Sequence, residues 1–84
     1  MNDGQLQASI SALILSIGSG AAMALGQAPN PQTGAVEIDK KMAKFNIDLL
    51  LVLKEKTKNN LNDEESKLLE SLLQDLQVKF VQAQ

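Results

Sequence analysis

The chain of 84 residues lacks several residue types on which common protein chemistries depend. It has no cysteine, which excludes disulfides and thiolate metal sites, and no histidine, the most frequent general base and metal ligand. Arginine, tryptophan and tyrosine are also absent, so the residue types that anchor most interface hot spots are missing. Any catalysis would depend on carboxylates, lysines, serines and threonines alone. We therefore predict a non-enzymatic protein with no catalytic residue, no metal site and no cofactor.

Positive charge is also limited. Eight lysines face ten acidic residues, which gives a formal net charge of -2. The lysines cluster at 40–44 and 54–58, but acidic residues accompany both clusters and no aromatic platform for base stacking lies near them. We therefore expect no nucleic acid partner.

The stretch SALILSIGSGAAMALGQAPNPQTG, from Ser11 to Gly34, carries no charge and divides into an apolar half and a proline-rich half. The apolar part, residues 10–25, is shorter than the ~20 residues that a membrane-spanning helix needs, and no lysine flanks it. A signal peptide is disfavoured because the preceding segment carries Asp3 and no positive side chain. These features favour a helix packed inside a water-soluble bundle over a membrane segment.

Two series of residues at helical spacing predict a first helix over residues 5–26. One series is an apolar stripe: Leu6, Ile10, Leu13, Ile17, Ala21 and Leu25. The other is a ridge of small side chains: Ala8, Ala12, Ser16, Gly20 and Ala24. Because such a ridge lets another helix approach closely, we expect it to form a self-association seam together with Leu13 and Ile17. A tight contact within the chain is the alternative.

The proline-rich segment, residues 27–35, is predicted to be a stiff loop. Gly26 suits the left-handed conformation that ends a helix, and the prolines prevent a new one from starting at once. Each proline also extends the residue before it, so that APNP is typical of polyproline II geometry, and Thr33-Gly34 offers a turn. The loop is either a rigid connector, which we favour, or a recognition element formed by Gln27, Pro29, Asn30, Pro31, Thr33 and Gly34.

A second helix is predicted over residues 37–58, with Glu37 and Asp39 in its first turn, where the helix dipole favours negative charge. One stripe alternates steps of four and three residues: Ile38, Met42, Phe45, Leu49, Val52 and Lys56. Further apolar residues lie on its other sides: Ile47, Leu50, Leu51 and Leu53. A single neighbour cannot cover so much apolar surface, so this helix is expected to pack on more than one side.

A third helix is predicted over residues 63–82, after a turn in which Asn59 or Asn60 adopts the left-handed conformation. Asn62 and Glu65 have the spacing of a capping box. The expected buried face consists of Leu69, Leu72, Leu76 and Phe80, widened by Leu68 and Leu73. The surface pairs expected at i,i+4 spacing are Asp63 with Lys67 and Asp75 with Lys79. Because the turn is short, the second and third helices are predicted to form an antiparallel hairpin, with a frayed end at 82–84.

The order of these features resembles the bacterial domain-of-unknown-function family 1844. The similarity extends from about Ser11 to Phe80 and depends on "LGQAPNPQTG" followed by "NIDLLLVLKEKTKNNLNDEESKLLESLLQDLQVKF". Gln27, Asn30 and Gln32 stand where that family's loop usually carries acids, which argues against a role that needs acidic loop residues. Since the family has no established activity, the resemblance implies a small cytoplasmic helical protein and assigns no catalytic residue.

We therefore predict a single all-α domain, residues 1–84, with three helices assembled as a homodimeric bundle, because a lone unit would leave an apolar face exposed. The expected function is a non-catalytic interaction or scaffold module that binds itself and another protein. One alternative is a peripheral membrane protein that uses the first helix. Another is a helical bundle that encloses an apolar small ligand.

Overall fold

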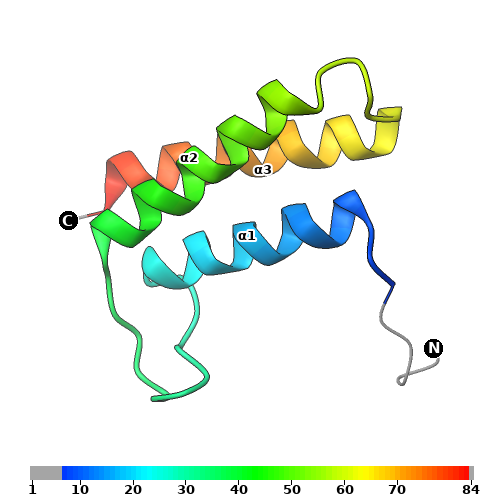
Figure 1. The fold of residues 1–84 in the computed structure, drawn as a ribbon. Helices are drawn as coiled ribbons and strands as arrows, with labels where there is room; N and C mark the ends of the chain where they lie inside the picture. Colours follow the sequence, from blue (N-terminus) through cyan, green and yellow to red (C-terminus); the bar gives the residue numbers. More distant parts are fainter. Residues whose placement is uncertain (1–6, 84) are drawn as a thin grey trace.

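The computed structural model describes residues 7–83 and contains three α-helices: α1 (Ile10–Ala24), α2 (Lys40–Lys56) and α3 (Asp63–Gln82) (Figure 1). Over those residues the only extended pairing is an isolated antiparallel bridge between Leu25 and Ile38. The all-α class and the three helices are confirmed. Predictions for Leu6 and for the last residue of the chain lie outside the described residues.

The three helices pack so that each contacts the other two. In Figure 1, α1 and α2 run in opposite directions, and α3 lies alongside α2 and runs back towards the end where α2 begins. The long loop between α1 and α2 extends from this same end of the bundle.

Helix α1 begins later than the predicted residue 5. Residues 7–9 are not helical, and the Ser9 hydroxyl caps the helix by accepting a hydrogen bond from the Ala12 amide at 3.0 Å. The apolar pattern does not indicate this start, because apolar residues at helical spacing continue on both sides of Ser9. The helix begins there because the serine hydroxyl satisfies a free amide of the first turn. At the other end the helix stops at Ala24, before the predicted residue 26, because Leu25 forms the C-cap. Gly26 has a φ of 77°, which confirms the predicted left-handed residue.

Helix α2 is shorter at both ends than predicted. Asp39 is not in its first turn but caps it, with Oδ1 accepting a hydrogen bond from the Met42 amide at 3.0 Å. Glu37 precedes the helix in the segment that pairs with the end of α1. The helix ends at Lys56, because Thr57 forms the C-cap and donates its amide to the Leu53 carbonyl at 2.9 Å.

The predicted bounds of α3 are confirmed, and so is its capping box. The Glu65 amide donates to Asn62 Oδ1 at 2.8 Å, and the Asn62 amide donates to Glu65 Oε1 at 2.9 Å. Asn59 takes the left-handed conformation with a φ of 68°. Of the two surface pairs, Lys79 contacts Asp75 at 3.0 Å, whereas no ion pair between Asp63 and Lys67 is present.

Each helix contributes one buried stripe to a common core. The buried apolar residues are Ile14, Ala21, Ala24, Leu25, Ala43, Ile47, Leu50, Leu69, Leu73 and Leu76. The face predicted for α3 is largely confirmed, since Leu69 and Leu76 are buried. The predicted stripe of α1 is confirmed at its end, where Ala21 and Leu25 are buried, and wrong nearer its start. There Ile14 is fully buried, whereas Leu13, about 100° around the helix, is 47% exposed.

A glycine outside the predicted small-residue ridge makes a tight contact between α1 and α3. A Cβ atom added to Gly18 would collide with the Leu72 side chain of α3. Gly20, which belongs to the ridge, has room for one, since the nearest atom would be Asn46 Oδ1 at 3.4 Å. Gly18 therefore allows α1 and α3 to pack closely, and Gly20 faces α2.

Candidate interaction surface

An exposed apolar row follows α2 and the segment just before it. We call it the outer stripe, and it consists of Ile38, which precedes the helix, and of Met42, Phe45, Leu49, Val52 and Lys56 on the helix. Leu49 is half-buried. Among its members, Ile38 is 50% exposed, Phe45 57% and Val52 55%. Because contiguous exposed apolar patches on a monomer are often interaction sites, the outer stripe is the first candidate for an interaction surface.

The opposite side of α2 packs inside the chain. Its buried residues are Ala43, Ile47 and Leu50. Phe45 is two residues from Ala43, which places the two side chains about 200° apart around the helix. The stripe with the regular four-three spacing is therefore not the face on which α1 and α3 pack, contrary to what its regularity suggests.

The predicted seam on α1 is divided by the fold. Ala8, Ala12, Leu13 and Ser16 are exposed, Ile17 and Gly20 are half-buried, and Ala24 is buried. The end of the ridge near Ala24 packs within the chain, and Gly20 lies against Asn46 of α2. Only the first half of the ridge is open to a second molecule.

The proline loop is closed by hydrogen bonds centred on Asn30. Its side-chain oxygen accepts from the Gln32 amide at 2.8 Å, and its carbonyl accepts from the Gly34 amide at 2.6 Å. Its own amide donates to the Ala35 carbonyl at 2.8 Å. The turn thus begins at Asn30, earlier than predicted, and Gly34 closes it with a φ of 72°.

The other loop residues proposed for recognition lie on the surface: Gln27, Pro29, Pro31 and Thr33 are exposed, and Asn30 is half-buried. The base of the loop is fixed where the Asp39 amide donates to the Ala24 carbonyl at 2.7 Å. A loop tied at its base and across its tip holds the ends of α1 and α2 together, as a connector must.

Lys40 makes a contact that the sequence does not indicate. Its Nζ donates to the Phe80 carbonyl at 2.7 Å and to the Ala83 carbonyl at 3.2 Å, and it lies 4.0 Å from the Phe80 ring centroid. A cation at the C-terminus of a helix satisfies free carbonyls and interacts favourably with the helix dipole. The two residues are 40 positions apart in the chain, so no local pattern could show this contact.

The grooves and polar side chains of the described residues were the other candidates for a site. A groove of about 520 Å³ runs between α2 and α3 and is open to solvent, with Lys54, Lys67 and Glu70 among its lining residues. Across residues 7–83 no cluster of three His, Cys, Asp or Glu side chains is placed to hold a metal ion, and no polar side chain is buried. Over the same residues no helix combines the length and apolar character needed to cross a bilayer.

The comparisons with known proteins identify a family without a known activity. The model of a family described as a domain of unknown function (DUF1844) matches residues 7–82, which include all three helices. No curated protein and no solved structure matches the chain.

Proposed function

The chain belongs to the DUF1844 family, and we propose that it is a non-catalytic interaction module that self-associates through apolar helix faces and also binds another protein. In this proposal α2 and α3 act as an antiparallel hairpin that holds the outer stripe rigid. The functional unit is a homodimeric bundle in the cytoplasm.

The outer stripe is the observation that carries this proposal. A single chain leaves Met42, Phe45 and Val52 each about half exposed, although larger apolar side chains are normally the first to be buried. Exposing such side chains to water is unfavourable by ~25 cal/mol for each Å² of apolar surface. A protein surface that covers the stripe removes this cost.

A peripheral membrane role for α1 is less well supported. The exposed leucines of this helix are Leu13 and Leu15, which are two residues apart and therefore point to opposite sides. A helix that lies on a bilayer needs its apolar residues on one face and lysine or arginine on the other. Helix α1 has no lysine or arginine at all.

The test of self-association is the solution mass of the full chain, measured by light scattering from about 1 to 500 µM in the absence of detergent. Detection by refractive index is suitable because the chain has no Trp or Tyr. We expect the mass of two chains at the higher concentrations, against 9.1 kDa for one. A mass of one chain over the whole range would refute self-association.

A further inference from the structure

We propose that the outer stripe of α2 pairs with the same stripe of a second copy, with the two α2 helices antiparallel. This inference rests on the proposed function and specifies the surface and the orientation. It also replaces the small-residue ridge of α1 as the main seam between subunits.

The spacing of the stripe is the first argument. Alternating steps of three and four residues keep one row of side chains facing a neighbouring helix, as in two-stranded helical packing. The residues that α2 buries within the chain are Ala43, Ile47 and Leu50, none of which belongs to this row. Leu49 is half-buried, but Phe45 and Val52 are more than half exposed. The row that is suited to helix pairing is therefore largely open.

The antiparallel arrangement pairs the four apolar members of the stripe that lie on the helix. With the two-fold axis near Ile47, Phe45 faces Leu49 of the second copy and Met42 faces its Val52. A large side chain thus meets a smaller one in each central layer.

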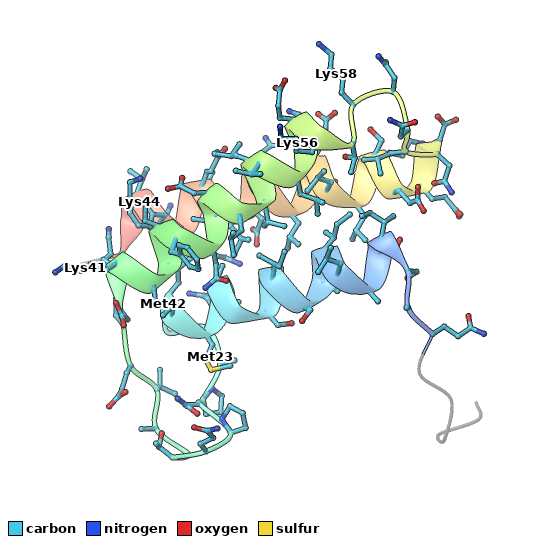
Figure 2. All side chains as sticks on the ribbon, viewed as in Figure 1. Met23, Lys41, Met42, Lys44, Lys56 and Lys58 are labelled. Atoms are coloured by element: carbon cyan, nitrogen blue, oxygen red, sulfur yellow. The ribbon has the colours of Figure 1, made fainter. Side chains whose placement is uncertain are left out.

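Charge bears on the orientation of the pair. Figure 2 shows Lys41 and Lys44 near one end of α2 and Lys56 and Lys58 near the other, so both orientations bring lysines together at the ends. A parallel pair would in addition place Glu55 against Glu55 and Lys56 against Lys56.

The charged residues beside the stripe favour the antiparallel orientation. Lys41 and Glu55 border the stripe on one side, and neither takes part in an ion pair within residues 7–83. Antiparallel pairing brings Lys41 of each copy next to Glu55 of the other. At the centre Asp48 approaches Asp48, but each is already bonded to Lys44 of its own chain at 2.8 Å, which offsets the repulsion.

The surface is tested by charged substitutions measured by light scattering and analytical ultracentrifugation. Phe45→Lys is expected to raise the dimer dissociation constant by at least ~30-fold, the effect of losing an interface hot spot. The matched control is Leu15→Lys on α1, since Leu15 is 51% exposed and Phe45 57%. Circular dichroism checks that both variants keep their helices. If Ser16→Lys separates the dimer and Phe45→Lys does not, the α1 ridge is the seam, and this inference fails while self-association stands.

The orientation is tested by reversing the flanking charges. Lys41→Glu and Glu55→Lys are each expected to weaken the dimer, and the double variant to restore it, because the two charges then exchange places. A parallel dimer would show no such rescue.

A cysteine cross-link gives an independent measurement, since the chain has no cysteine of its own. A mixture of Lys41→Cys and Glu55→Cys chains is expected to form a disulfide between the two kinds of chain and not between identical ones. Disulfides between identical chains only would show a parallel pair and overturn the orientation. No cross-link of any kind in a chain that still dimerises would overturn the α2 seam.

Discussion

Both faces of α2 are apolar, and side-chain size alone does not explain which of them is buried. The buried face consists of Ala43, Ile47 and Leu50, whereas the exposed face includes Phe45, one of the two phenylalanines in the chain. A small residue such as Ala43 in the buried face lets neighbouring helices approach closely. Phe45 and Val52 face outwards, where a helix partner can pack against them. Burial within one chain and apolar character are therefore separate properties of this helix.

The prediction with the largest expected effect compares one residue on the buried face of α2 with one on the exposed face. Replacing Leu50, which is fully buried, by alanine should lower the free energy of unfolding by ~2–5 kcal/mol because it leaves a cavity in the core. Replacing Phe45 by alanine should cost less than ~1 kcal/mol at concentrations where the chain is monomeric, since the ring is 57% exposed. Urea unfolding followed by far-ultraviolet circular dichroism measures both. Equal losses would show that the two faces are equally important within one chain.

A second test extends the comparison to α1. Gly18→Ala should lower the free energy of unfolding by up to ~2 kcal/mol, because the new methyl group collides with Leu72, and moving that side chain costs more than the better helix former gains. Gly20→Ala, at the side facing α2, should leave stability unchanged or raise it by up to ~1 kcal/mol, since alanine is the better helix former and has room there. Thermal melts of the two variants provide the measurement. The comparison would fail if Gly18→Ala proved the more stable of the two.

A third test uses adjacent lysines on the two sides of α2. Lys40→Met removes the cation from the C-terminal carbonyls of α3 and should cost ~1 kcal/mol of stability. Lys41→Met, at an exposed position, should change stability by less than ~0.5 kcal/mol when measured below the dimer concentration. Urea unfolding distinguishes them, and a similar change in both variants would argue against a special role for the Lys40 contact.

The smallest expected effect concerns the ion pair beside the outer stripe. Lys44→Ala should lower stability by only ~0.3–0.5 kcal/mol, because the pair with Asp48 is largely exposed and screened by salt. The same substitution should also weaken the proposed dimer, since it leaves Asp48 of each copy facing the other. Unfolding in low and in high salt, at low and at high protein concentration, separates the two effects.

Much of the local structure could be predicted because its causes are local. The capping box of Asn62 and Glu65 fixes the start of α3 within four residues of sequence, and Gly26 and Asn59 adopt the left-handed conformation because glycine and asparagine tolerate it. The start of α1 was misplaced by the apolar pattern, since the Ser9 cap interrupts the helix without interrupting the pattern. The spacing of the sequence predicts the row of residues that forms the candidate surface. It does not predict whether that row is buried or exposed.

The sequence by itself determined three helices, their turns, the all-α class and the regular row on α2, because each follows from spacing and from the conformations that single residues allow. Only the tertiary structure decided which side of α2 is buried, because apolar residues lie on nearly every side of that helix and periodicity cannot choose among them. It also decided that Gly18 meets Leu72 and that Lys40 binds the end of α3. Those contacts join residues far apart in the chain, and only the packing of the helices brings them together.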